Sequence, residues 1–195
     1  MHHVGGTWKG HGLSEAPRKA DDGQAGETAS EVSVLVAARR AKLEALRRDL
    51  GIEPYGQRVD GLVDLATARS RFSEADHHAH TEAVAVAKNA AGAPGSVAAA
   101  ISDPRQVVKV AGRIMQHRDL GKLIFIFLRD HSGDLQVSIS RNEVDAAAWE
   151  LAKHLDYGDL VVAEGPIGRT NKGEICVWAK SLSMHAKSLV PPPEK

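Results

Sequence analysis

The hydrophobic pattern of this chain changes its period near residue 105, and this change limits the folds that the chain can adopt. Upstream, apolar residues recur every three or four positions, as they do along one face of a helix. Downstream, Val108, Val110 and Ile114 alternate with Lys109 and Arg113, as they do in a half-buried strand. The sequence therefore predicts a helical region followed by a β-rich domain.

The β-rich part carries the signals of several strands and one helix. The predicted order is strands over 108–115, 123–128 and 135–140, a helix over 144–155, and strands over 160–167 and 175–182. Turn residues separate strands at 120–122, 131–134 and 171–173. Three strands, a helix and two strands are the order of the OB-fold, a five-stranded Greek-key barrel with a helix between its third and fourth strands. A small β-barrel of another topology is the alternative.

The region before the barrel is predicted to be a tail followed by helices. Residues 1–30 are rich in glycine and polar residues and lack apolar periodicity, which predicts disorder. An amphipathic helix is expected over 31–50, between Ser30 as N-cap and Gly51 as C-cap. Its leucines fall near one face (Leu35, Leu43, Leu46 and Leu50). An Ala-rich helix is expected over 62–91, then a linker at 92–96 and one more helical turn at 97–102.

The expected organisation is a tail over 1–30, a helical region with a linker over 31–103, and the barrel over 104–190. Residues 191–195 are expected to be a hinge, because their run of prolines can join neither a helix nor a sheet. The fold class is thus a β-barrel with a helical extension, α+β.

Composition excludes several classes of protein. The 25 basic and 25 acidic side chains cancel, so any electropositive surface for nucleic acid has to be local. Cys176 is the only cysteine, which rules out an internal disulfide and fits a reducing cytoplasm. The chain lacks an apolar run of about 18 residues that would span a membrane, and its N-terminus lacks the apolar core of a signal peptide. We expect a cytoplasmic protein.

Three patterns that resemble metal or catalytic sites are interpreted as structural. His77 and His80 share a helix face, but no known ligand spacing accompanies them, so no metal is expected. The Gly-rich run over 165–173 lacks the Gly-Lys-Ser/Thr ending of a phosphate-binding loop. Cys176 stands in a predicted strand beside Trp178, which favours packing over reactivity. No set of nucleophile, base and orienting group is visible, so no catalytic residue is expected.

The predicted second strand is apolar on both faces, which leaves its orientation open. If Ile124, Ile126 and Leu128 face the core, Phe125 faces outward. An outward Phe125 beside an outward Gln136 of the third strand supplies a π-face for stacking a base and an amide for reading its edge. In the alternative, the other face of the strand points inward and Phe125 lies in the core.

Basic side chains lie on the predicted strands and on the first helix. Arg113, Arg118 and Lys122 belong to the first hairpin and are candidates for phosphate contacts. Arg40 and Arg47 belong to the basic face of the helix over 31–50, which offers the same chemistry. The alternative for both groups is a solvated charged surface.

Two dense sequence runs resemble class II lysyl-tRNA synthetases. Val110-Ala-Gly-Arg-Ile-Met115 and Gly133-Asp-Leu-Gln136 are similar to parts of the first three strands of that family's anticodon-binding barrel. Gly165-Pro-Ile-Gly-Arg-Thr-Asn-Lys-Gly-Glu174 is similar to the hairpin of its last two strands. Residues 40–55 resemble its N-terminal helix, and residues 187–195 resemble the hinge into its catalytic domain. The resemblance covers about 31–58 and 105–195.

The resemblance implies that the barrel binds the U-rich lysine anticodon as part of a lysine–tRNA ligase. By position, Phe125 corresponds to the aromatic residue that stacks on the central anticodon base, which implies that it faces outward. Gln136 and Arg118 correspond to side chains that contact anticodon bases. Glu174 corresponds to an acidic contact in the hairpin between the fourth and fifth strands. The implied partner is a tRNA.

The chain departs from the family in ways that limit its expected activity. Residues 59–104 match poorly and look like a longer helical insertion, and the class II catalytic motifs are absent from the sequence. ATP and Mg²⁺ are therefore expected only for a missing class II catalytic domain. We expect the chain alone to be inactive as a ligase and to be a monomer or a weak dimer. The alternative function is a free-standing OB-fold module that binds single-stranded nucleic acid or a protein.

Overall fold

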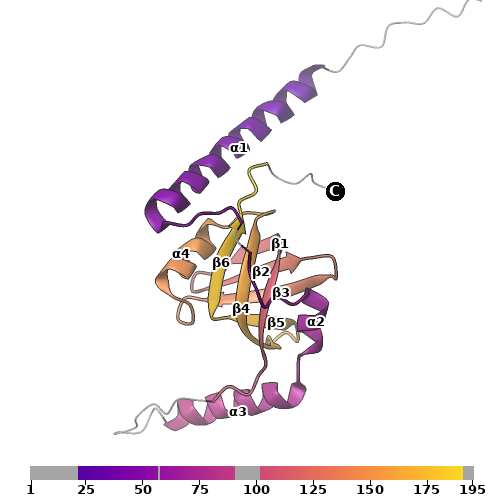
Figure 1. Cartoon of the computed structure of the whole chain (residues 1–195), viewed down its shortest axis with the longest axis vertical. Helices are drawn as coiled ribbons and strands as arrows, with labels where there is room; N and C mark the ends of the chain where they lie inside the picture. The colour runs from indigo at the N-terminus through magenta and orange to yellow at the C-terminus, as the bar shows by residue number, and fades with distance from the viewer. Residues whose placement is uncertain (1–21, 57, 91–101, 191–195) are drawn as a thin grey trace, which may run out of the picture.

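The structure, a computed structural model, describes residues 22–56, 58–90 and 102–190 (Figure 1). The expectations for residues 1–21, for the linker at 92–96, for the turn from 97 to 101 and for the hinge at 191–195 lie outside the described residues. Within the described part, no helix is long and apolar enough to cross a membrane.

A six-stranded sheet forms a closed five-stranded barrel with one extra strand. The strands are β1 (Val107–Asp119), β2 (Leu123–Arg129), β3 (Asp134–Ser140), β4 (Leu160–Arg169), β5 (Ile175–Ala179) and β6 (Ser181–Ala186). Their order is β1-β2-β3-β5-β4-β6, and an additional pairing of β1 with β4 closes the sheet. Helix α4 (Ala146–His154) lies between β3 and β4 in the chain. The arrangement confirms the predicted OB-fold, with one extra strand.

Strand β1 closes the barrel by pairing with two strands in succession. Its first half pairs antiparallel with β4 and its second half with β2, and Arg113 takes part in both ladders. A register shift between Ile114 and Gln116 marks a bulge, which bends the strand between its two neighbours. A Cβ on Gly112 would lie 2.9 Å from the Cβ of Leu128, so this close approach of the two strands requires glycine.

The predicted fifth strand is divided into β5 and β6. β5 pairs in parallel with β3 and antiparallel with the end of β4, whereas β6 pairs with the beginning of β4. The division falls at Lys180, whose backbone N–H donates to the Glu164 carbonyl at 2.8 Å. The two segments therefore pair with opposite ends of β4.

The core contains the side chains that alternation predicted for β3, and in β2 it contains the set that belongs to one of the two orientations left open. Fully buried are Ile124, Ile126 and Leu128 of β2 and Leu135, Val137 and Ile139 of β3. Burial of each contributes roughly 1.5–3 kcal/mol. Helix α4 adds the predicted residues Trp149, Ala152 and Leu155 to the core cluster, with Leu155 just beyond the helix. Asp145 starts the helix, because its carboxylate accepts the backbone N–H of Ala148 at 2.7 Å.

Helix α1 (Asp22–Leu50) is longer than predicted. It begins at Asp22 and not after Ser30, so the predicted disorder of residues 22–30 is wrong. Leu43 and Leu46 are buried as expected, but Leu35 is 50% exposed. Figure 1 shows that α1 lies against the barrel at its C-terminal end and projects away from it toward its N-terminus.

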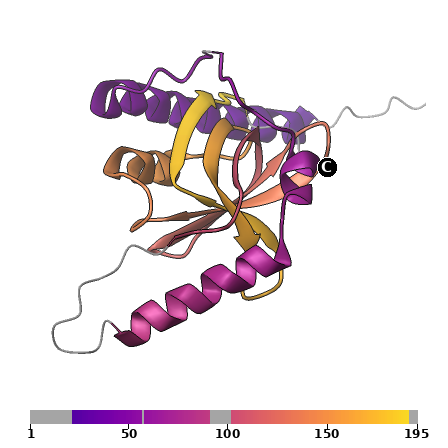
Figure 2. The same cartoon turned by 60° about the horizontal axis from the view of Figure 1, so that its bottom comes forward.

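The predicted Ala-rich helix is broken into α2 (Leu65–Ser70) and α3 (Glu74–Ala90). Leu65 and Ala68 of α2 are buried in the barrel's core cluster. The chain then leaves the barrel, and α3 extends away from it (Figures 1 and 2). Ser73 begins the new helix, because its hydroxyl accepts the backbone N–H of Asp76 at 3.2 Å.

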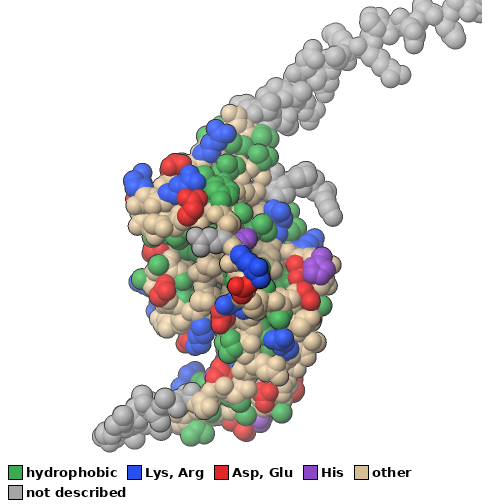
Figure 3. Space-filling view, in the orientation of Figure 1, with side chains coloured by type: hydrophobic (Ala, Val, Ile, Leu, Met, Phe, Trp, Pro, Cys, Tyr) green, Lys and Arg blue, Asp and Glu red, His purple; other side chains and the backbone are tan. Residues whose placement is uncertain are grey.

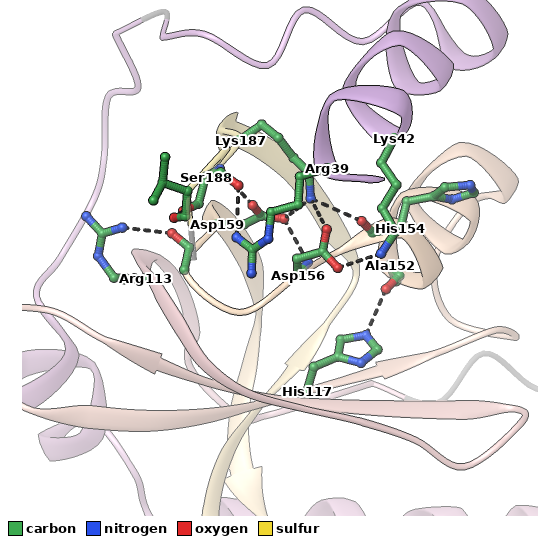
Figure 4. Close-up of polar contacts among 12 residues, drawn as sticks. Arg39, Lys42, Arg113, His117, Ala152, His154, Asp156, Asp159, Lys187 and Ser188 are labelled. Atoms are coloured by element: carbon green, nitrogen blue, oxygen red, sulfur yellow. Dashed lines mark hydrogen bonds and ion pairs between the residues drawn. The ribbon is translucent and has the colours of Figure 1, made fainter. Parts of the chain in front are cut away.

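A buried ionic network joins α1 to the end of the barrel (Figure 4). The ammonium group of Lys187, whose side chain is fully buried, lies 2.6 Å from Asp156 Oδ2 and 2.8 Å from Asp159 Oδ2. From α1, Lys42 Nζ lies 2.5 Å from Asp156 Oδ1. Burial by itself would raise the pKa of Asp156, but hydrogen bonds from Lys187 and Lys42 outweigh burial and lower this pKa. Two carboxylates thus balance two ammonium groups.

The same network fixes the chain where it leaves the barrel. Asp159 Oδ1 accepts the backbone N–H of Ser188 at 2.9 Å, and the Ser188 carbonyl accepts a hydrogen bond from Arg39 of α1, also at 2.9 Å. Three segments far apart in sequence are therefore held at one point.

We expect Lys187→Met to destabilise the fold, because it leaves the Asp156 and Asp159 carboxylates with too little countercharge. Breaking a buried ion pair costs roughly 3–5 kcal/mol, so the free energy of unfolding measured in urea should fall by about that amount. Lys172→Met, in an exposed turn, is the control and should unfold like the parent. A Lys187→Met variant as stable as the parent would show that the network does not hold these segments together.

Candidate nucleic-acid interface

The outer face of β2, β3 and β5 is made of side chains that alternate with the core. Strand register places Phe125 of β2 opposite Ser138 of β3, and Ser138 opposite Trp178 of β5. One step along the strands, Phe127 is opposite Gln136. We call these outward residues (Phe125, Phe127, Gln136, Ser138 and Trp178) the platform.

Phe125 lies on the side of the platform next to β1. Its sequence neighbours Ile124 and Ile126 are fully buried, whereas its own ring is half-buried. The ring therefore faces outward, and the alternative in which Phe125 points into the core is wrong. In register, Arg118 of β1 lies on one side of Phe125 and Ser138 on the other. The exposed guanidinium of Arg118 thus lies beside the outward ring of Phe125. The ring can stack on a base, and the guanidinium can contact the edge of that base.

Gln136 lies on the platform but is not exposed as predicted. It is only 8% exposed, and its amide nitrogen lies 3.9 Å from the Sγ of Cys176. Phe127 and Cys176 flank it in register and leave little access. Burial raises the pKa of the Cys176 thiol to about 12, so the thiol stays protonated and inert. Alternation predicted the face on which Gln136 lies but not its depth.

Glu174 lies at the other end of the platform from Arg118. It is exposed in the hairpin between β4 and β5, where its carbonyl accepts the backbone N–H of Thr170 at 2.9 Å. Gly173 supplies the positive φ of 89° that this turn requires. Because β5 runs parallel to β3, Glu174 lies near the start of β3 and Arg118 near its end. The predicted site residues thus share one face but are spread along it.

The basic residues predicted to contact the phosphate backbone of a nucleic acid are divided between two regions. Lys122 is exposed in the turn between β1 and β2, at the same end of the platform as Arg118. Arg113 donates to the Gly158 carbonyl at 2.8 Å and lines a surface cavity with Met115 and Tyr157.

Two further predicted contacts lie on α1, away from the platform. This helix packs against α4, so the structure does not bring Arg40 or Arg47 to the platform. Arg47 also pairs with Glu44 and Glu53 and lies over the ring of Tyr55. The solvated-surface interpretation therefore fits these two residues better.

Side chains of α3 contact the C-terminal end of β4. Arg169 at the end of β4 pairs with Glu74 of α3. Burial, followed by the positive charge of Arg105, lowers the pKa of His77 and of His80, so both imidazoles are neutral near pH 7. Among the described residues, no three His, Cys, Asp or Glu side chains are placed to hold a metal ion.

Charge on the molecular surface is mixed. Figure 3 shows Lys and Arg side chains interspersed with Asp and Glu on the visible face. Several arginines are engaged by carboxylates, such as Arg129 by Asp134 and Arg105 by Asp103. Attraction for an anionic partner therefore depends on exposed cations such as Arg118 and Lys122, which form no ion pair within the described ranges.

Two platform residues were missed by reasoning from the sequence. Alternation already placed Ser138 on the same face as Gln136, but a serine carries no signal of its own. The parallel pairing of β3 with β5 joins strands far apart in sequence, and only this pairing brings Trp178 beside Ser138.

Comparisons with known proteins place the barrel in a described family. Residues 108–192 match the tRNA anti-codon family, which is an OB-fold nucleic acid binding domain. The chain is similar to lysine–tRNA ligases of several bacteria. Identity is 47% over 92 residues for Dehalococcoides mccartyi, covering 47% of this chain and 18% of that protein. For the enzyme of Enterococcus faecalis, identity is 34% over 157 residues, which cover 80% of this chain and 27% of that protein. For the enzyme of Bordetella parapertussis, identity is 36% over 168 residues, which cover 86% of this chain and 29% of that protein. The chain thus spans less than a third of the length of these relatives.

Proposed function

We propose that this chain binds the anticodon loop of a lysine-accepting tRNA, because residues 108–192 match the tRNA anti-codon family of OB-fold nucleic acid binding domains. The observation that carries the proposal is the platform, where outward Phe125 lies between Arg118 and Ser138 on the face that OB-folds use for oligonucleotides. The similarity to lysine–tRNA ligases supports lysine as the amino acid.

Each site residue has a role that follows from its position. Phe125 stacks on one anticodon base, since an aromatic π-face accepts any base. Gln136, which lies opposite Phe127, supplies an amide to a base edge once the Phe127 ring moves aside. Arg118 at one end and Glu174 at the other contact further bases, because each is exposed at an end of the platform. Lys122 and Arg113 are suited to phosphates, which position the RNA but do not identify its sequence.

The ligation reaction is proposed to belong to the part of the relatives that this chain does not match. The chain supplies RNA recognition for tRNA aminoacylation, and a class II catalytic domain would supply ATP and Mg²⁺ binding. We place the protein in the cytoplasm, where translation occurs, and expect a monomer or a weak dimer for the chain alone.

Phe125→Ala tests the platform directly. Base–aromatic stacking contributes roughly 1–3 kcal/mol, so affinity for a U-rich anticodon stem-loop should fall roughly 5- to 150-fold. The melting temperature should change little, because an outward ring leaves no core cavity. Tyr55→Ala, which removes an exposed ring outside the platform, should bind like the parent.

Two results would count against the platform. A Phe125→Ala variant that binds the stem-loop as tightly as the parent would remove stacking from the account. Equal affinity of the parent for unrelated single strands would favour the free-standing module over an anticodon-binding domain.

Arg118→Ala and Lys122→Ala separate base reading from phosphate contact. One lost phosphate contact to a single strand should reduce the slope of log affinity against log salt by about 0.7. We expect this for Lys122→Ala, with affinity reduced equally for all loop sequences. Arg118→Ala should leave the slope nearly unchanged and reduce discrimination between U-rich and other loops. The reverse pattern would exchange the two roles.

A further inference from the structure

Ser138 occupies the middle of the platform and has an unusual environment. It is 1% exposed, and its hydroxyl has no hydrogen-bond partner among the described residues. Phe125 and Trp178 are its register partners on the two neighbouring strands. A small polar side chain therefore lies between two half-buried aromatic rings.

A buried hydroxyl without a partner weakens a fold. Most buried polar side-chain atoms in proteins are hydrogen-bonded, and those that are not require an explanation. An alanine at this position would fill nearly the same space without a polar atom to satisfy. The amide of Gln136 has a similar deficit, since its nitrogen has only the sulfur of Cys176, at 3.9 Å, as a partner within the described ranges. The indole Nε1 of Trp178 is also buried without a partner within the described ranges, so the platform holds three polar groups that the protein itself satisfies poorly.

The register explains what such a hydroxyl can contact. Neighbouring strands lie about 4.8 Å apart, so Arg118, Phe125 and Ser138 form one row across β1, β2 and β3. A base that stacks on the Phe125 ring has one edge toward Arg118 and the opposite edge toward Ser138. A serine hydroxyl both donates and accepts, so it can pair with a carbonyl or an N–H group of that edge.

We propose that Ser138 is a specificity-determining residue, whose hydroxyl bonds to the edge of the base stacked on Phe125. The inference rests on the proposed function and adds a residue that neither the sequence pattern nor the family match singles out. The partner that the hydroxyl lacks in the free protein is supplied by the bound RNA, after the flanking rings move to admit the base.

Ser138→Ala is the test, with affinity and stability measured together. Loss of one neutral hydrogen bond should weaken binding of the U-rich stem-loop about 2- to 12-fold. Discrimination should fall at a single loop position, found by changing one base at a time. The melting temperature should stay equal or rise, because an unsatisfied polar atom is removed from a buried site. Ser183→Ala, at an exposed position of β6, should match the parent in all three measurements.

The possible outcomes separate this inference from the proposed function. If Phe125→Ala weakens binding and Ser138→Ala does not, the inference fails while the anticodon function stands. If Ser138→Ala lowers the melting temperature or weakens binding equally for every loop, the hydroxyl is structural and the inference is again wrong. If the parent does not bind the stem-loop, both proposals fail together.

Discussion

The pairing of β1 with both β2 and β4 closes the sheet, and the positions of the platform and the helices follow from it. An open sheet would present unpaired backbone groups along two edges. Closure requires a long strand that bends between two partners, and Gly112 permits the close approach to β2 at the bend. The same pairing sets Arg118, near the end of β1, beside Phe125 of β2.

Buried polar groups occur in two places in the barrel, and they are satisfied to different degrees. Where α1 meets the barrel, Lys187 lies between Asp156 and Asp159, so folding itself supplies every charge with a partner. On the platform, Gln136 and Ser138 are buried with few partners. The first set stabilises the native state, whereas the second reduces the stability of the free protein, and we propose that a bound RNA supplies the missing bonds. On that proposal, stability and recognition depend on different groups of the same small domain.

The sequence predicted the barrel well because alternation in the strands is a local property. In β2, which is apolar on both faces, alternation left two orientations open, and only the family resemblance favoured the one with Phe125 outward and Ile124, Ile126 and Leu128 in the core. The depth of Gln136 could not be predicted, since it depends on Phe127 and Cys176 of other strands. The exposure of Leu35 depends on where α1 leaves the barrel, which the helical period does not contain. The start of α1 at Asp22 was missed because residues 22–30 show no apolar period.

The most direct test of the central claim is to map the RNA on the protein by backbone amide chemical shifts. A U-rich anticodon stem-loop is titrated into the chain, and shift changes are followed residue by residue. We predict that the largest changes cluster on β2, β3 and the end of the β4–β5 turn, around Phe125, Gln136 and Glu174. Changes confined to α1 and β6, with the platform unaffected, would contradict this prediction.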